Sequence, residues 1–267
     1  MHGRFHTAAV LAPEVVARVS RHRDQAARVR RQHAILAAVE AAALPVVVPR
    51  NASEVVVRGG RAGMLTTYVC GESREGALWD AVGPAVQSLL AALSGVDIVG
   101  TARGLPRPRA WCGGDGWPDV VRAHLLPLLP TDVRESAQAV VEGVLAAERG
   151  VRPALVHGDL GPQNLLWEGA RLVGLIDFDH ACAGDPAIEA ATLLGVYGAA
   201  AVETIVDGPA LERAMMHRGS LSLQLAAAAL ELGDAPLRDH ALTNFVGRAR
   251  AGTLYDPGGR VPIRRLG

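Results

Sequence analysis

The stretch that decides the fold is residues 156–186, VHGDLGPQNLLWEGARLVGLIDFDHACAGDP. Three polar residues, Asp159, Asn164 and Asp177, stand in it at fixed distances between apolar runs. Carboxylate and amide oxygens are the ligands that hard cations such as Mg²⁺ prefer in proteins. The apolar runs at 154–157 and 172–176 predict short strands that flank a loop, so we expect an oxygen-lined cation site at strand ends.

The residues before this stretch predict a small sheet around one helix. β-Branched runs on either side of Pro13 predict a hairpin, apolar residues spaced by three and four predict a helix, and Gly59–Gly60 predicts a turn between two more strands. These segments are 6–12 and 14–20 for the hairpin, 24–43 for the helix, and 53–58 and 63–69 for the later strands.

After residue 70 the chain becomes mainly helical. The predicted helices are 79–93, 120–129, 132–148 and a series that runs from Pro186 almost to the end. Thr131 or Asp132 is expected to cap the third helix, and the Gly-, Pro- and Arg-rich segment 100–118 predicts a loop. We therefore predict an α+β fold, with a small mixed-sheet lobe in residues 1–70 and a larger, mainly helical lobe in residues 71–267.

All 27 basic residues are arginine, and the chain contains no lysine. This composition excludes a lysine Schiff base, a P-loop lysine and a lysine general base, so any phosphate must be bound by arginine, backbone N–H groups or a metal. Asp and Glu also number 27, which gives a formal net charge of zero. A neutral chain argues against bulk nucleic-acid binding, because that binding depends on neutralising phosphates.

Three widely spaced cysteines, Cys70, Cys112 and Cys182, predict free thiols without a disulfide framework. No apolar run approaches the roughly 20 residues that a membrane-spanning helix needs. The opening residues MHGRFHTAAV lack the apolar region of a signal peptide. We expect a cytoplasmic protein without a membrane partner, and the sequence leaves its oligomeric state open.

The charges are unevenly distributed along the chain. Residues 1–110 contain 14 arginines and 8 acidic residues, whereas residues 155–240 contain 4 arginines and 12 acidic residues. One interpretation is surface charge on unrelated faces, and the other is a site with one wall for an anion and another for a cation. The asymmetry alone favours the first interpretation.

His-Gly-Asp with Asn164 five residues after the Asp, followed by IDFD and GDP, resembles the signature of the aminoglycoside phosphotransferase family. GRFHTAAVLAPEVVARVSR resembles the opening hairpin of that family, VRRQHAIL its kinase-type helix C, LTTYVCGES its hinge between lobes and GWPDVVRAHLLPLL the helix before its catalytic loop. WEGARLVGLIDFDHACAGDPAIEAATLLGVYG is similar in particular to the viomycin and capreomycin phosphotransferases. The resemblance covers nearly the whole chain and implies a two-lobe, protein-kinase-like fold.

The resemblance implies roles for the polar residues of the central stretch. Asp159 would be the catalytic base that accepts the proton of a substrate hydroxyl, and Asn164 and Asp177 would hold Mg²⁺ on the triphosphate. Asp179, two residues after a metal ligand, has two interpretations of equal weight, a substrate contact and a structural role.

The resemblance also implies a nucleotide site in the first lobe. The backbone of Thr67, Tyr68 and Val69 would meet the adenine at the hinge. Arg18 stands where the family places a strand lysine or arginine, aimed at the α- and β-phosphates, although a strand arginine could also be a surface residue. ATP and GTP both stay open as the phosphoryl donor.

Three further residues are expected to support the catalytic loop. His157 could be a metal ligand or a base, but in this setting hydrogen bonding that orders the loop is favoured. Asp185 and Glu189 resemble family positions that brace the loop or cap the next helix, and we interpret them as structural.

Two features depart from the family pattern. The helix position that carries a glutamate in kinase folds is Gln32 here, which can hydrogen-bond but carries no charge. The glycine-rich loop is thin, because only Gly3 precedes the first strand. Either the start of the chain is truncated or Gly3, Arg4 and His6 cover the phosphates.

We therefore expect an ATP- and Mg²⁺-dependent antibiotic O-phosphotransferase that confers resistance to a cationic antibiotic, with a tuberactinomycin peptide of the viomycin or capreomycin type as the preferred acceptor. The acidic second lobe would suit such a cation. Its candidate residues are Asp179, Glu203, Asp207, Glu231, Asp234 and Asp239.

Two alternatives stay open. An aminoglycoside or a small-metabolite alcohol could be the acceptor within the same fold. The second alternative is a catalytically inactive pseudokinase that only binds nucleotide. The missing lysine, Gln32 and the glycine-poor loop support it. The joint presence of Asp159, Asn164 and Asp177 opposes it.

Overall fold

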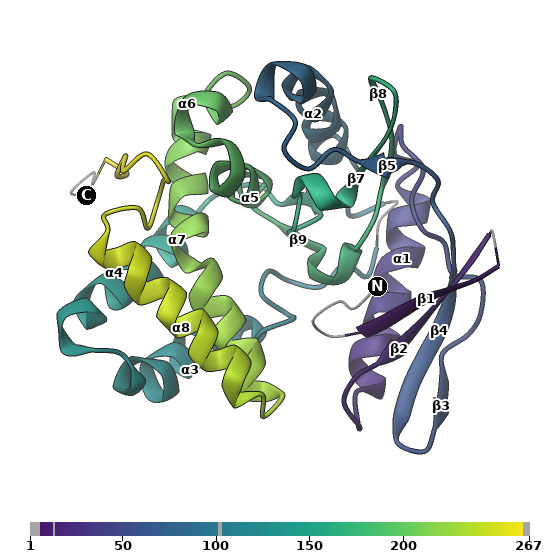
Figure 1. The fold of residues 1–267 in the computed structure, drawn as a ribbon, viewed down its shortest axis with the longest axis horizontal. Helices are drawn as coiled ribbons and strands as arrows, with labels where there is room; N and C mark the ends of the chain where they lie inside the picture. The colour runs from purple at the N-terminus through teal and green to yellow at the C-terminus, as the bar shows by residue number, and fades with distance from the viewer. Residues whose placement is uncertain (1–5, 13, 101–102, 264–267) are drawn as a thin grey trace. The chain divides into compact units, whose positions relative to one another are not determined.

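A computed structural model describes residues 6–12, 14–100 and 103–263, and Figure 1 shows their helices and strands. Contacts divide the chain into two units. The first comprises the chain up to Pro106 together with Gly161–Ala181, and the second comprises Arg107–Leu160 together with the chain from Cys182 onward. The α+β class is confirmed, whereas the predicted lobe boundary after residue 70 stays a prediction.

The first unit opens with a four-stranded antiparallel sheet in the order β1-β2-β4-β3. Its strands are β1 (His6–Ala12), β2 (Val15–Ser20), β3 (Val56–Arg58) and β4 (Arg61–Thr67). The predicted hairpin and the predicted later strands are confirmed, except that Pro13 lies outside the described residues. Gly59 and Gly60 both have positive φ, +57° and +77°, which gives the two-residue turn between β3 and β4 its required twist.

Helix α1 (Ala26–Ala41) packs against β4 beside this sheet. Its buried residues recur at helical spacing, with Val29, Gln32, Leu36 and Val39 on one stripe. Burial of this stripe, rather than side-chain capping, holds the helix, because its N-cap residue makes no side-chain cap hydrogen bond.

A second, three-stranded sheet of the first unit has the order β5-β7-β8. Its strands are β5 (Glu72–Ser73), β7 (Leu165–Glu168) and β8 (Arg171–Leu175), and 3₁₀ turns η4 (Pro162–Asn164) and η5 (Phe178–His180) flank the last two. Strand β8 confirms the strand expected at 172–176. The strands β5 and β7 were not predicted, because the apolar run that forms β7 has no alternating pattern.

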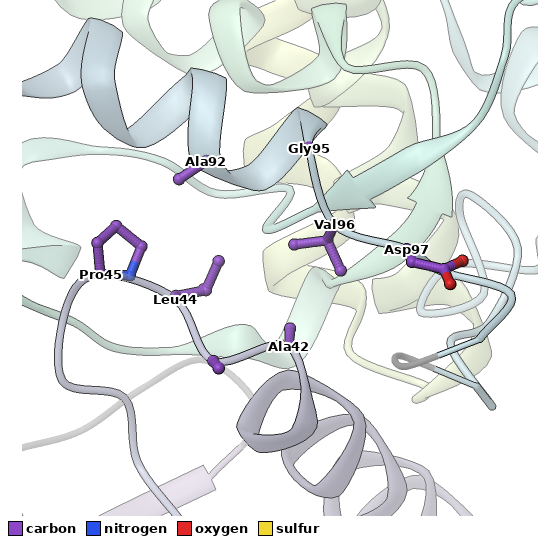
Figure 2. Close-up of a pocket in the computed structure, with 8 residues that line it drawn as sticks. Ala42, Leu44, Pro45, Ala92, Gly95, Val96 and Asp97 are labelled. Carbon is purple, nitrogen blue, oxygen red and sulfur yellow. The ribbon is translucent and has the colours of Figure 1, made fainter.

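Helix α2 (Trp79–Ser94) also belongs to the first unit and confirms the helix predicted there. A shallow pocket of about 270 Å³ lies between its end and the end of α1, lined by small and apolar side chains and Asp97 (Figure 2). None of the residues predicted to carry chemistry lines this pocket.

The second unit is built around the long helix α7 (Gly208–Glu231), which packs most extensively against three long helices. These are α4 (Thr131–Ala147), α5 (Ala187–Tyr197) and α8 (Ala235–Arg250), and the short α6 (Ala199–Val202) follows α5. Four consecutive alanines, 226–229, are buried in α7, as expected for a helix surrounded by others. Strands β6 (Ala154–Val156) and β9 (Cys182–Gly184) form an antiparallel pair, so β6 confirms the strand expected at 154–157.

One prediction for this unit needs refinement and one is wrong. The helix expected at 120–129 is present, but residues 117–128 form three consecutive helical segments of different winding: α3 (Trp117–Val120), the π-helix η2 (Val121–Leu125) and the 3₁₀ helix η3 (Leu126–Leu128). Pro127, which has no N–H to donate, lies in the 3₁₀ segment. The expected cap of the following helix is wrong. Helix α4 has no side-chain cap from Thr131 or Asp132. Asp132 instead accepts two hydrogen bonds from Arg250, at 2.9 and 3.1 Å.

Candidate functional site

The β7–β8 hairpin brings the two predicted metal ligands together. Asn164 directly precedes β7, and Asp177 follows the end of β8 by two residues. Leu165 pairs with Leu175, and the N–H of Ile176 donates to the carbonyl oxygen of Asn164 at 3.0 Å. The hairpin therefore places the backbones of Asn164 and Asp177 at the same end of the same pair of strands.

Asp177 adopts a left-handed backbone conformation, with φ at +67°. This conformation costs a non-glycine residue about 1 kcal/mol, and such strain gathers at functional positions. The Asp177 side chain is 47% exposed, whereas Asn164 is buried. The Asp177 carboxylate thus stands half exposed at the end of the hairpin, after an enforced turn.

Asn164 and Asp177 together offer one amide oxygen and one carboxylate. The described residues contain no group of three or more His, Cys, Asp or Glu arranged to hold a metal. Mg²⁺ keeps several waters and is commonly held by one or two protein carboxylates plus substrate phosphates. This donor set therefore fits Mg²⁺ shared with a nucleotide, and does not form an all-protein cage.

Arg18, on β2, contacts both carboxylates of the IDFD segment. Its Nη2 donates to Oδ1 of Asp179 at 2.6 Å and lies 3.4 Å from Oδ1 of Asp177. The other oxygen of Asp179, Oδ2, lies 3.2 Å from Nδ1 of His6 at the start of β1. The first unit thus contains a cluster of Arg18, Asp179 and His6 with little exposure to solvent, and Asp177 lies at its edge.

The electrostatics of this cluster keep its charges in place. Burial alone would lower the pKa of Arg18, but the carboxylates of Asp179 and Asp177 outweigh burial and raise the pKa above its ordinary value. Burial would raise the pKa of Asp179, and the Arg18 guanidinium, helped by His6, instead holds that pKa below its ordinary value. The pair is therefore ionised across the physiological range.

The second unit contains the catalytic-loop aspartate. Buried strand β6 leads into His157 and Gly158, and the half-buried Asp159 follows. Glu189, in the first turn of α5, accepts the N–H groups of His157 and, at 3.3 Å, Gly158. The N–H of Asp159 donates to Nδ1 of His157 at 3.2 Å, which makes Nδ1 an acceptor and leaves the ring proton on Nε2. Two buried side chains thus fix the backbone that carries Asp159.

Burial sets the protonation of Glu189. It raises the pKa of Glu189 to about 7, against the amide hydrogen bonds that lower it, and the nearby Asp159 carboxylate adds to the rise. With a pKa of about 7, Glu189 is only partly ionised near neutral pH, beside the Asp159 carboxylate.

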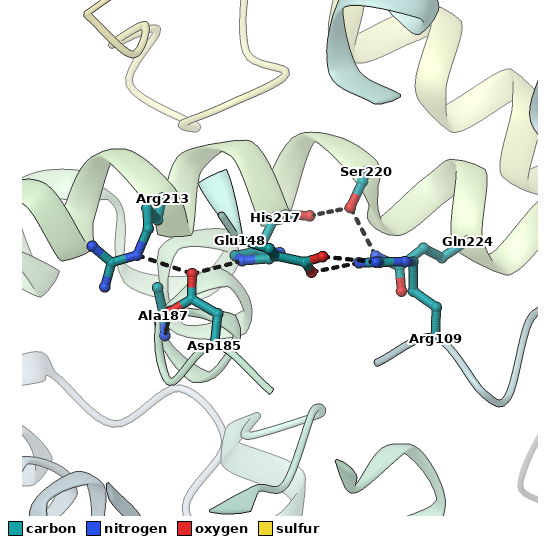
Figure 3. A network of polar contacts seen from close by, with 8 residues as sticks. All are labelled: Arg109, Glu148, Asp185, Ala187, Arg213, His217, Ser220 and Gln224. Atoms are coloured by element: carbon teal, nitrogen blue, oxygen red, sulfur yellow. Dashed lines mark hydrogen bonds and ion pairs between the residues drawn. The ribbon is translucent and has the colours of Figure 1, made fainter. Parts of the chain in front are cut away.

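Asp185 anchors the segment that precedes α5 (Figure 3). Its carboxylate accepts the N–H of Ala187 at 2.9 Å and Nε of Arg213 at 2.9 Å, and lies 3.2 Å from Nε2 of His217. Burial would raise the pKa of Asp185, but the His217 hydrogen bond and the other donors hold it below its ordinary value. Arg213 and His217, both on α7, thus hold the Asp185 carboxylate at the start of α5.

The predicted hinge follows β4. The N–H of Thr67 donates to the carbonyl of Arg50, and the N–H of Tyr68 donates to the carbonyl of Glu14, both at 2.9 Å. These two donors are therefore used within the first unit. The described residues provide no hydrogen-bond acceptor for the N–H of Val69, so Val69 is the hinge residue whose donor is available.

Several of the acidic residues that were expected to contact a cationic acceptor have other partners in the structure. Asp207 and Asp234 are N-caps, accepting the N–H groups of Ala210 at 2.7 Å and Leu237 at 3.0 Å. Glu203 pairs with Arg260 at 2.6 Å, and Asp239 pairs with Arg238 at 2.8 Å. Asp179 belongs to the Arg18 cluster.

The structure thus brings together two groups of predicted residues. Arg18, Asn164, Asp177 and Asp179 lie in the first unit, and the loop-supporting residues lie with Asp159 in the second, since the division falls between Leu160 and Gly161. Sequence reasoning missed Arg213 and His217. Their spacing of four on one helix was a readable signal that both side chains share a face.

Comparisons with known proteins agree with this geometry. A model of the phosphotransferase enzyme family, APH, matches residues 4–230. Viomycin phosphotransferase of Streptomyces vinaceus is 35% identical over 124 residues, which are 43% of this chain and 43% of that protein. Homoserine kinase of Pseudomonas aeruginosa (strain PAO1) is 46% identical over 65 residues, 23% of this chain and 21% of that protein. The matches thus span less than half of each curated relative.

A solved structure, the GDP and kanamycin complex of APH(2")-IIia, resembles this chain with a TM-score of 0.75. It is 17% identical, and the likeness covers 94% of this chain and 92% of that one, which shows a shared kinase-like fold. None of the described helices has the length and apolarity to cross a membrane. Because the family model spans most of its residues and the fold agrees, the chain belongs to the phosphotransferase enzyme family.

Proposed function

We propose that this protein transfers the γ-phosphoryl group of ATP or GTP to a hydroxyl group of a cationic antibiotic. The preferred acceptor is a tuberactinomycin peptide of the viomycin or capreomycin type. The observation that carries the proposal is the β7–β8 hairpin, which holds Asn164 and Asp177 at one end, in a chain whose Asp159 stands on a loop fixed by Glu189.

Asp159 is proposed to accept the proton of the acceptor hydroxyl as phosphoryl transfer proceeds. General-base catalysis of this kind contributes roughly 10²- to 10⁴-fold to the rate. Glu189 and His157 orient the Asp159 backbone through three hydrogen bonds, which limits the positions its carboxylate can take. Neither support residue needs to contact the substrate.

Asn164 and Asp177 are proposed to bind Mg²⁺. When bound, the ion neutralises charge on the phosphates and helps position them for in-line transfer. Arg18 is proposed to add a second cation at the α- and β-phosphates, a task arginine can perform because it is always charged and presents several N–H donors in one plane. The lysine-free composition is compatible with this arrangement.

The hinge is proposed to bind the nucleobase through backbone groups, with Val69 supplying the N–H donor because those of Thr67 and Tyr68 are already bonded. Residues 1–70 would form the nucleotide lobe, and residues 71–267 would carry the catalytic loop and the acceptor site in a cytoplasmic enzyme. Backbone recognition alone leaves ATP and GTP as alternative donors.

The choice of acceptor rests on the match to viomycin phosphotransferase, which is longer than the match to homoserine kinase. The match to homoserine kinase supports the alternative, a small-metabolite alcohol. Kanamycin in the similar solved structure supports an aminoglycoside as a further alternative, at 17% identity.

The test is a transfer assay with γ-³²P-labelled ATP and, separately, GTP, each with Mg²⁺ and one acceptor at a time. The panel is viomycin, capreomycin, kanamycin and homoserine, with product mass determined for every labelled acceptor. We expect label on viomycin or capreomycin with the highest kcat/KM. Label on homoserine alone would replace the antibiotic by a metabolite, and no label on any cationic antibiotic contradicts the proposal.

Asp159→Asn separates an enzyme from a nucleotide-binding pseudokinase. The enzyme should lose turnover by roughly 10²- to 10⁴-fold while its nucleotide affinity is retained, since the base acts on the acceptor hydroxyl. A pseudokinase would bind nucleotide in both forms and label no acceptor in either.

A further inference from the structure

Arg18 lacks the helix partner that a cation in its position has in kinase folds. The corresponding residue on α1 is Gln32, which is neutral and buried, and its Oε1 has no hydrogen-bond partner among the described residues. The single acidic residue of α1 is Glu40, whose half-exposed side chain lies 3.6 Å from Arg50. Helix α1 therefore supplies no carboxylate that anchors Arg18.

Asp179 provides the anchor instead. Its Oδ1 lies 2.6 Å from Nη2 of Arg18, and both side chains are only 13% exposed. The contact of the same nitrogen with Asp177 is longer, at 3.4 Å, and Asp177 is 47% exposed. A short, shielded ion pair restricts a guanidinium far more than a long, solvated one.

His6 completes the anchor from the neighbouring strand. Arg18 pairs with Ala8 across the β1–β2 ladder, and His6 stands two residues before Ala8, so all three project from the same face of the sheet. His6 is buried, and its Nδ1 lies 3.2 Å from Oδ2 of Asp179. Each oxygen of Asp179 thus lies within 3.2 Å of a nitrogen, from Arg18 on one side and His6 on the other, which restricts the orientation of the carboxylate.

This arrangement leaves part of the guanidinium available. Only Nη2 of Arg18 contacts Asp179 and Asp177, and the described residues offer no partner to Nε or Nη1. A guanidinium has five N–H donors in a rigid plane, so one nitrogen can be anchored while the others bind a phosphate.

We propose that Asp179 is the positioning residue of the phosphate-binding arginine, taking the task that a helix glutamate performs in kinase folds. It holds Nη2 of Arg18 so that Nε and Nη1 face the α- and β-phosphates, and it does not contact the acceptor directly. The inference rests on the proposed function in that it takes a nucleoside triphosphate to be the ligand of Arg18.

The experiment measures nucleotide binding without any acceptor, by titration calorimetry with Mg²⁺ and a non-hydrolysable ATP analogue. The variants are Asp179→Asn, Arg18→Ala, the double variant, and Asp179→Glu. Asp179→Asn should raise the nucleotide Kd roughly tenfold, the loss expected when a charge-assisted anchor becomes neutral. Asp179→Glu, which keeps the charge, should recover part of that loss.

The double variant distinguishes positioning from other roles. Once Arg18 is alanine, Asp179→Asn should cause no further rise in the nucleotide Kd, because the residue it positions is gone. Equal and additive losses would overturn the inference. Glu168→Gln is the matched control, since it removes a 2.6 Å ion pair with Arg171 that lies on the surface of the same unit.

Acceptor kinetics supply the remaining readout. In the transfer assay, Asp179→Asn should raise the nucleotide KM and leave the acceptor KM unchanged, and a rise in the acceptor KM alone would assign Asp179 to the substrate instead. If the wild-type protein bound no nucleotide, the proposed function would fail first. If wild type and Asp179→Asn bound nucleotide equally, the inference alone would fail.

Discussion

Glu189 in α5 accepts the backbone N–H of His157, two residues before the predicted catalytic base. A side chain that lies 32 positions away along the chain therefore sets the shape of the loop that carries Asp159. Burial gives this contact a pH dependence, because it raises the pKa of Glu189 from 4.5 to about 7.

We expect Glu189→Gln to remove a pH-dependent loss of stability. Below pH 4.5 Glu189 is protonated in both states, whereas between pH 4.5 and 7 the unfolded chain releases the proton that the folded protein keeps. Wild-type stability from this group is therefore lost as the pH rises through that window, by on the order of 3 kcal/mol. Glutamine does not titrate, so its stability relative to wild type should improve from about pH 5 to about pH 7.5.

Urea unfolding at the two pH values measures this difference. Glu168→Gln serves as the control, because it makes the same Glu-to-Gln change at an exposed side chain that pairs with Arg171 and, among the described residues, makes no ion pair with the catalytic loop. A difference between Glu189→Gln and wild type that does not change with pH would contradict the raised pKa.

Asp177→Gly should raise the free energy of unfolding and abolish phosphotransferase activity. The residue has φ at +67°, a conformation that glycine adopts freely, so the variant should gain about 1 kcal/mol of unfolding free energy. Its phosphotransferase activity should fall to background, because the carboxylate proposed to hold Mg²⁺ is gone. Ala43→Gly, at φ +48° and outside the site, should gain stability without loss of activity. An active Asp177→Gly enzyme would remove Asp177 from the proposed metal site.

Gln32→Met should stabilise the protein without weakening nucleotide binding. Oε1 of Gln32 is buried without a hydrogen-bond partner among the described residues, and an unpaired buried acceptor costs roughly 1–3 kcal/mol. Methionine has a similar shape and no such group, so thermal unfolding should shift upward. A raised nucleotide Kd in this variant would show that Oε1 serves the nucleotide site.

Asp207→Ala and Asp234→Ala should each destabilise the protein by about 1 kcal/mol, because each removes an N-cap. We expect the acceptor KM to stay unchanged in both variants, since their carboxylates already accept backbone N–H groups. Thermal unfolding and acceptor kinetics measure the two effects separately. A raised acceptor KM with little loss of stability would show that these residues contact the acceptor.

Local patterns predicted much of the fold. The hairpin around Pro13, the helix with Val29 and Leu36, and the turn at Gly59–Gly60 could be predicted because each depends on neighbours within a few residues. The apolar spacing of segment 120–129 predicted a helix, but not the change of winding from α to π to 3₁₀, for which Pro127 is the one local signal.

The same difference between local patterns and long-range contacts applies to the candidate site. The proximity of Asn164 and Asp177 at one end of the strand pair could be predicted from spacing, because one hairpin connects them. The contact between Arg18 and Asp179 joins residues 161 positions apart, and no local pattern reports it. The capping role of Asp207 and Asp234 was readable, since each is followed two residues later by a proline that favours a helix start.

The β7–β8 hairpin also determines where this protein tolerates a change in length. Its two-residue tip, Gly169–Ala170, joins Glu168 and Arg171, and the ladder contains an irregularity between Leu166 and Trp167. A single residue inserted between Asn164 and that irregularity would shift the register of the ladder, so that Asn164 would no longer lie at the same end of the hairpin as Asp177. Residues added at the exposed tip would leave the ladder as it is, so the tip is the place for an affinity tag or a reporter peptide.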